Sequence, residues 1–195
     1  MASRQELWFN RPLEILSPGG GEATPSNGAC VFRESFEAAI GGDFVVLTVG
    51  NDLRGDDGVG PYVARVLADR FPDRIFDGGQ APENFLGPLR RSKAGMIVFV
   101  DAADFGGMTG DIRVMAGDEV DGAGISTHAA PLGMLMRAFA EELNARVLLI
   151  AVQAGQTRLG AAMSDEVRHA SERVAEELAR ALGAPSDRKT RETES

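Results

Sequence analysis

Several ionisable side chains follow short apolar segments of this chain, and their spacing is the first indication of chemistry. Five aspartates and an asparagine lie at or just after the ends of such segments, and one histidine precedes an expected helix. The set is Asn51, Asp56, Asp57, Asp77, Asp101, Asp104 and His128. Ligands of open α/β sheets bind beyond the carboxyl ends of the strands, so we expect these residues at one edge of a sheet.

Two or three carboxylates with one imidazole suit a divalent metal of borderline-hard preference. Without a cation, neighbouring carboxylates would repel one another and some would take up protons. Structural explanations stay open for each residue. Asp56 or Asp57 could cap the helix that begins near Gly58, Asp101 could accept hydrogen bonds from loop amides, Asp77 could belong to a turn, and His128 could be an ordinary loop histidine.

Other chemistries fit the sequence less well. The glycine-rich segment GNDLRGDDGVG (50–60) precedes a helix, where anions can bind. It lacks the glycine and lysine patterns of nucleotide sites, and its two aspartates would repel a phosphate. There is no Gly-x-Ser-x-Gly motif, and Cys30 is far in sequence from the carboxylates. His169 falls on the charged side of the last expected helix, so we expect it to be solvated.

Apolar runs alternate with helical periodicity over most of the chain, which predicts the elements that must position these residues. Such alternation is typical of an α/β fold with a mostly parallel sheet covered by helices on both faces. The expected strands are 44–49, 74–76, 96–100 and 146–152, with a possible edge strand at 111–115. The expected helices are 58–71, 82–91, 131–143 and one that Ser164 caps and Gly183 ends.

The two ends of the chain differ from this pattern. Residues 1–42 form an N-terminal extension that we expect to be partly irregular, with a short amphipathic helix at 31–41. Residues 43–183 form the folded domain. The polar tail 184–195 is expected to be disordered.

Charge and composition exclude some classes of protein. Asp and Glu number 29 against 20 Lys and Arg, a formal charge of −9, which disfavours binding to nucleic acid. No apolar stretch reaches about 18 residues, so we expect no membrane span. The single cysteine and the absence of a signal-peptide pattern favour the cytoplasm. Nothing in the sequence demands a dimer, and we expect a monomer.

Four motifs occur together in one order: GNDLRGDDGVGP (50–61), DGGQAPENFLGPLRR (77–91), VFVDAADFG (98–106) and STHAAPL (126–132). They resemble the [NiFe]-hydrogenase maturation endopeptidases. The segment Gln80–Asn84 looks closest to the branch that processes the formate-hydrogenlyase-type hydrogenase. The resemblance covers about residues 44–182, with two departures: Gln153-Ala154-Gly155 stands where the family often has Gln-Pro, and the extension before Phe44 is longer.

The resemblance implies a compact three-layer α/β/α peptidase domain with a twisted sheet. It implies removal of a short C-terminal peptide from the hydrogenase large-subunit precursor, the partner, after nickel insertion. The family's metal-contacting positions fall on Asp57, Asp101 and His128. We expect Asn51, Asp56 and Asp77, which lie at the same strand ends, to support them. Nickel would come from the substrate, and no organic cofactor is implied.

Two other functions remain open at this point. One is a peptidase of the same fold with another substrate, using paired carboxylates for metal-free acid–base chemistry. The other is a nickel-dependent binding module without hydrolysis. If the substrate is a folded protein, an exposed patch should flank the cluster, and Phe85, Phe105 and Pro131 are candidates by position.

Overall fold

The computed structural model describes residues 36, 39–40, 43–117, 120, 126–127 and 132–183. His128, Pro131, the tail 184–195 and most of the extension 1–42 therefore lie outside the described residues. None of the described helices is both long enough and apolar enough to cross a membrane.

The described residues form one sheet with five strands in the order β2-β1-β3-β6-β4 and a short sixth strand, β5, paired with β3. The pairs β1–β2, β1–β3 and β3–β6 are parallel, while β4 runs antiparallel to β6 and β5 antiparallel to β3. This confirms the mostly parallel sheet and the expected edge strand. The strands are β1 (Phe44–Thr48), β2 (Ile75–Asp77), β3 (Met96–Asp104), β4 (Ile112–Ala116), β5 (Ser126–Thr127) and β6 (Arg146–Gln153).

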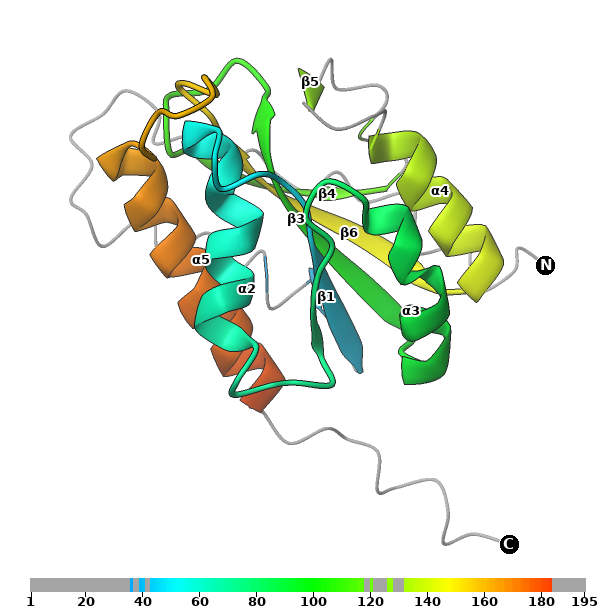
Figure 1. Ribbon diagram of the computed structural model, residues 1–195. Helices are drawn as coiled ribbons and strands as arrows, with labels where there is room; N and C mark the ends of the chain where they lie inside the picture. Colours follow the sequence, from blue (N-terminus) through cyan, green and yellow to red (C-terminus); the bar gives the residue numbers. More distant parts are fainter. Residues whose placement is uncertain are drawn as a thin grey trace, which may run out of the picture.

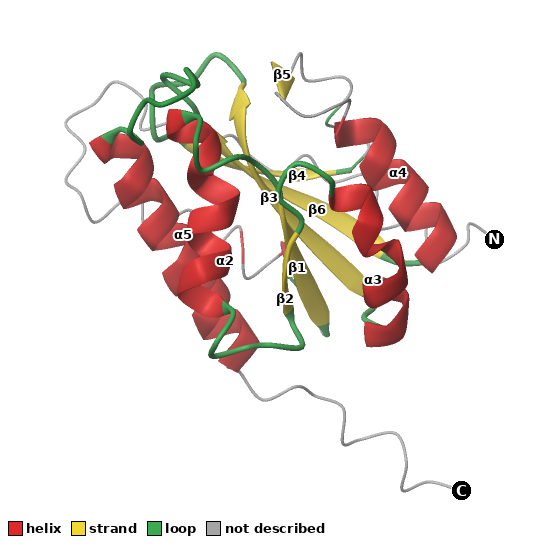
Figure 2. Ribbon diagram, viewed as in Figure 1, coloured by secondary structure: helices red, strands yellow, loops and turns green. Residues whose placement is uncertain are grey.

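Helices cover both faces of this sheet, which confirms the three-layer α/β/α architecture. Helices α2 and α5 lie side by side on one face, and α3 and α4 lie on the other (Figures 1 and 2). The helical elements are η1 (Gly55–Gly58), α2 (Val59–Leu67), η2 (Pro82–Phe85), α3 (Leu86–Ser92), α4 (Leu132–Leu143) and α5 (Asp165–Gly183).

The alternation of side chains along β3 divides the core into two clusters. Val98 and Val100 pack in the cluster under α2 and α5, whereas Ile97 and Phe99 pack in the cluster under α3 and α4. Because successive strand residues point to opposite faces, Asp101 faces the α3/α4 side. Phe36, which is fully buried, belongs to the α2/α5 cluster, so the chain ahead of β1 also contributes to the core.

Three predicted boundaries are wrong. Strand β3 continues to Asp104 instead of ending at Val100, because its parallel pairing with β6 continues as far as Ala103 and Gln153. Helix α2 ends at Leu67, where the chain enters a turn before Pro72. The helix expected at 82–91 begins as the 3-10 turn η2 and becomes α-helical only from Leu86.

Candidate functional site

The glycine-rich loop between β1 and α2 folds back tightly on the end of β1. A Cβ atom on Gly60 would lie 2.0 Å from the Val49 carbonyl oxygen, and one on Gly50 would lie 2.1 Å from that of Asp57. Gly50 also has a φ of +133°, a conformation that side chains disfavour. The Asn51 N–H donates to the Asp57 carbonyl oxygen at 2.9 Å. Asn51 thus lies in the loop that presents Asp57.

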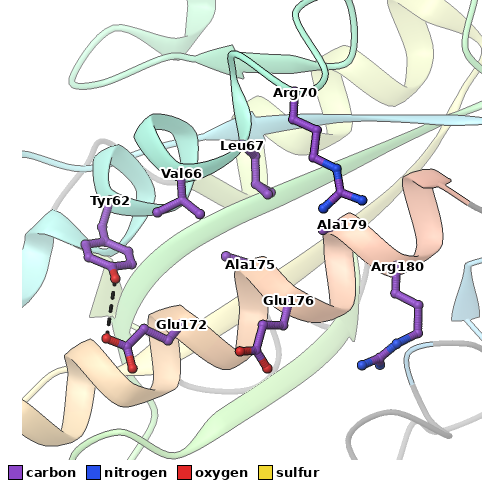
Figure 3. Close-up of a pocket in the computed structure, with 9 residues that line it drawn as sticks. All are labelled: Tyr62, Val66, Leu67, Arg70, Glu172, Ala175, Glu176, Ala179 and Arg180. Atoms are coloured by element: carbon purple, nitrogen blue, oxygen red, sulfur yellow. Dashed lines mark hydrogen bonds between the residues drawn. The ribbon is translucent and has the colours of Figure 1, made fainter.

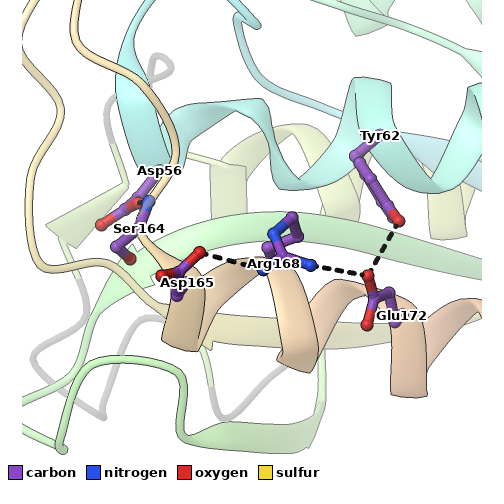
Figure 4. Close-up of polar contacts among 6 residues, drawn as sticks. All are labelled: Asp56, Tyr62, Ser164, Asp165, Arg168 and Glu172. Carbon is purple, nitrogen blue, oxygen red and sulfur yellow. Dashed lines mark hydrogen bonds and ion pairs between the residues drawn. The ribbon is translucent and has the colours of Figure 1, made fainter.

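Asp56 connects this loop to two distant segments. Its carboxylate is fully buried and accepts three backbone hydrogen bonds. Oδ2 accepts from Gly155 at 2.8 Å and from Gln156 at 2.9 Å, and Oδ1 accepts from Ser164 at 2.7 Å. The glycine-rich loop is therefore attached to the loop after β6 and to the start of α5 (Figure 4).

Two capping predictions are wrong. Neither η1 nor α2 has a side-chain cap, so neither Asp56 nor Asp57 caps the helix that follows them. The Ser164 hydroxyl does not cap α5 either, since its Oγ is buried with no hydrogen-bond partner in the described part of the chain. For Asp56 the reason is that its carboxylate reaches across the molecule and accepts from Gly155, Gln156 and Ser164 instead of from its own helix.

Asp57 and Asp101 form a buried pair of carboxylates. The residues are 6% and 1% exposed, respectively. Asp101 Oδ1 accepts from the N–H of Ala102 at 2.9 Å, while its buried Oδ2 has no hydrogen-bond partner among the described residues. Burial, and next the negative charge of Asp57, raise the pKa of Asp101 well above its ordinary value, and the Ala102 hydrogen bond opposes this rise.

A buried carboxylate oxygen without a partner is costly unless a proton or a cation binds to it. The donor chemistry of the pair therefore fits either a divalent metal ion or a shared proton. In the described residues, no group of three potential metal ligands occurs. His128, which would be the third, is outside them.

The chain segment before His128 does reach this edge of the sheet. Strand β5 pairs Ser126 with Asp104 and Thr127 with Ala103, so the backbone lies against the end of β3 one residue before His128. This pairing places the segment next to the strand that carries Asp101.

Asp77 and Asp104 lie at the same end of the sheet but are exposed. Asp77 Oδ1 accepts from the N–H of Gly79 at 3.2 Å and lies 3.4 Å from the Thr48 hydroxyl. Asp104 Oδ1 accepts from the N–H of Gly106 and from Gln153, each at 3.1 Å. Both carboxylates therefore order loops in this structure.

Gln153, the last residue of β6, also orders the loops at this edge of the sheet, a role that the sequence did not predict. It is 5% exposed. Its Oε1 accepts from the N–H groups of Phe105 at 2.9 Å and Gly107 at 3.1 Å, and its Nε2 donates to Asp104. The only signal in the sequence is an amide directly after an apolar strand.

A groove of about 530 Å³ lies between α2 and α5 (Figure 3). Its lining includes Tyr62, Arg70, Glu172 and Arg180, and it contains none of the predicted site residues. The groove lies on the α2/α5 side, whereas Asp101 faces the α3/α4 side. We therefore assign the candidate site to the carboxylates at the end of the sheet.

Comparison with known proteins identifies the family of this α/β domain. The family model described as hydrogenase maturation protease matches residues 61–181. The chain belongs to this family. The hydrogenase maturation protease described here is therefore a hydrolase that cleaves peptide bonds, and the resemblance drawn from its four motifs is confirmed.

Individual relatives match over most of their own length. Hydrogenase 3 maturation protease of Escherichia coli (strain K12) is 31% identical over 137 residues, which is 69% of this chain and 87% of that protein. The crystal structure of a [NiFe] hydrogenase maturation protease HycI from Thermococcus kodakarensis shares 30% identity and a TM-score of 0.64, covering 79% of this chain and 99% of the other. The solution structure of the Escherichia coli endopeptidase HycI shares 29% identity and a TM-score of 0.63, covering 72% and 92%.

Proposed function

We propose that this protease removes a short C-terminal peptide from the large-subunit precursor of a [NiFe] hydrogenase, and that it does so only after the precursor carries nickel. It acts as a monomer in the cytoplasm, the compartment that its single cysteine favours. Membership of the family supports the reaction class. The observation that carries the proposal is the buried Asp57–Asp101 pair, in which Asp101 Oδ2 has no protein partner in the described region.

Asp57, Asp101 and His128 are the residues that would contact the nickel of the precursor. Carboxylate and imidazole ligands suit such an ion, and the partnerless Oδ2 is a ready acceptor. Bound nickel would report that the precursor is loaded, and as a Lewis acid it could polarise the scissile carbonyl group.

This chain's own residues fix the positions of those ligands. Asp101 is held in place because it lies within β3, where it and the residues on either side of it all pair with β6. Asp57 lies in the loop that the buried Asp56 attaches to the start of α5. Such restraint favours binding, because few side-chain conformations are lost when the substrate arrives.

Exposed apolar side chains near the site fit a protein substrate. Leu53, Met108 and Leu159 are 64%, 60% and 73% exposed, and they lie on the loops after β1, β3 and β6. We call these three residues the apolar rim. The first and third loops touch, since the Gly160 N–H donates to the Leu53 carbonyl oxygen at 2.8 Å.

The apolar rim differs from the patch that the sequence suggested. Phe85 and Phe105 are half-buried and pack against the α3/α4 cluster, so they offer little free surface. The Phe85 ring lies 6.3 Å from that of Phe76. The rim is the surface that we propose for docking of the precursor.

Mass spectrometry of a purified precursor tests the proposal. The precursor, with or without nickel, is incubated with wild-type protein, Asp57→Asn, Asp101→Asn or the exposed control Asp52→Asn. We expect the wild type and the Asp52→Asn control to remove the C-terminal peptide from the nickel-loaded precursor only. We expect Asp57→Asn and Asp101→Asn to cleave neither precursor. Full activity of Asp57→Asn would refute its assigned role, and equal cleavage of unloaded precursor would refute the nickel requirement.

One observation favours a second candidate, in which the two carboxylates do acid–base chemistry without a metal. The raised pKa of Asp101 beside a charged Asp57 is the arrangement by which a carboxylate pair holds one proton. Cleavage that is indifferent to nickel, but abolished by Asp101→Asn, would support this candidate. The non-hydrolytic binding module has no such support, since the chain belongs to a protease family.

A further inference from the structure

Arg113 occupies the same row of the sheet as Asp101. Arg113 of β4 pairs with Ala151 of β6, and Ala151 pairs with Asp101 of β3. Side chains in register across neighbouring strands point to the same face, so all three face the α3/α4 side. In this row of the described sheet, Ala151 stands between Asp101 and Arg113, whose backbones are about 10 Å apart at the usual strand spacing.

The Arg113 guanidinium is fixed in place without an anion. Its carbon lies 4.4 Å from the centroid of the Phe105 ring, and its Nε is buried with no hydrogen-bond partner. Within the described part of the chain, Arg113 forms no ion pair, whereas Arg74, Arg90 and Arg168 each contact a carboxylate. Phe105 is itself held, because its N–H donates to Gln153.

These features are those of a preorganised anion subsite. A planar guanidinium binds a carboxylate through two parallel hydrogen bonds, and an aromatic ring beneath it keeps its orientation. The protein has a formal charge of −9 and is already highly charged. Solubility therefore does not explain an unpaired arginine beside the acidic site. Because Nε is buried, an incoming carboxylate would meet the terminal nitrogens of this half-buried residue, which form no ion pair in the described part of the chain.

We propose that Arg113 binds a carboxylate of the substrate's C-terminal tail and so holds the tail beside Asp101. This inference rests on the proposed function. The carboxylate could be the terminal one or an acidic side chain of the tail, and both have the chemistry that Arg113 recognises. Arg113 is thus a substrate-positioning residue of the reaction.

Steady-state kinetics on nickel-loaded precursor test this role with Arg113→Gln, Arg113→Lys and a matched control, Arg65→Gln. Arg65 is exposed and also lies over an aromatic ring, that of Tyr62 at 5.8 Å, so the control removes the same charge and the same kind of contact. We expect Arg113→Gln to raise KM about tenfold with kcat changed less than about twofold, the effect of one charged hydrogen bond made equally in the ground and transition states. Arg113→Lys should lie between, and Arg65→Gln should match the wild type.

Two altered precursors identify the carboxylate. One has the acidic side chains of its tail converted to amides, and the other has an amidated C-terminus. Neutralising the bound carboxylate should raise KM for the wild type but produce no further rise for Arg113→Gln. An unchanged KM in Arg113→Gln, or additive effects with both precursors, would overturn the inference.

Thermal unfolding of each variant separates loss of binding from loss of the fold. If Arg113→Gln is unfolded, the same comparison with Arg113→Lys decides, because the lysine stem keeps most of the packing. Absence of cleavage by the wild type would instead overturn the proposed function, so the two failures are distinguishable.

Discussion

Replacement of Asp56 by alanine should strongly destabilise the protein. The Asp56 carboxylate is fully buried, and its loss leaves the N–H groups of Gly155, Gln156 and Ser164 without their acceptor. A hydrogen bond to a charged group contributes about 1.5–3 kcal/mol. Three such bonds give an upper bound, and partial relaxation of the two loops lowers the expected cost to about 3–5 kcal/mol.

Asp56→Asn should cost less, for a geometric reason. An asparagine carbonyl oxygen at the Oδ2 position keeps the bonds from Gly155 and Gln156. Its amide nitrogen then faces the N–H of Ser164, which places two donors together. With one of three bonds lost and the others weakened, we expect about 2 kcal/mol.

Urea unfolding followed by circular dichroism measures both free energies, and thermal unfolding checks them. At about 2–4 °C per kcal/mol for a chain of this size, Asp56→Ala should lower Tm by about 10 °C. Asp52→Ala, an exposed change in the same loop, should stay within about 0.5 kcal/mol of the wild type. A cost below about 1 kcal/mol for Asp56→Ala, or equal costs for Asn and Ala, would refute the three-bond account.

Three further predictions concern the same edge of the sheet. The pKa of Asp101 is raised in the folded state, so the wild type loses stability as pH rises above the pKa of an unfolded aspartate. Asp101→Asn does not titrate, and its unfolding free energy relative to the wild type should therefore be more favourable at about pH 8 than at about pH 4. A difference in unfolding free energy that does not change with pH would contradict this. Gly60→Ala should prevent the close approach to Val49 and lower Tm sharply, since the added Cβ would lie 2.0 Å from a carbonyl oxygen, and unchanged melting would show that the loop can shift. Gln153→Leu leaves two loop N–H groups without their acceptor and should cost about 2–4 kcal/mol in urea unfolding; a smaller cost would mean that water replaces the amide.

The fold was predictable because its signals are local. The run Phe44–Val49 and the run Arg146–Val152 are short, apolar and bounded by polar residues, and each corresponds to a buried strand. The helical spacing of Val167, Val174 and Leu178 correctly gave the buried face of α5. The end of β3 was not predictable, because hydrogen bonding to β6 overrides the polar character of Asp101 and Asp104.

The candidate site was predictable only in part. That Asp101 is buried beside Asp57 follows from the sheet topology, which the alternation of elements implied. The contacts of Asp56 were not predictable, because its partners are 99 to 108 residues away and are backbone groups that carry no side-chain signal. Arg113 was missed for a related reason, since its place in the row with Asp101 depends on the pairing of β4 with β6.

The long sequence separation of the Asp56 contacts has a consequence for the order of folding. Closing loops of 99 to 108 residues carries a large entropic cost, so we expect these hydrogen bonds to form late, after β6 has joined the sheet. During synthesis, the loop that carries Asp57 lacks the anchor that Asp56 provides until the residues from Gly155 to Ser164 have left the ribosome. The loop that carries Asp57 is therefore fully held in place only when nearly the whole domain has been made.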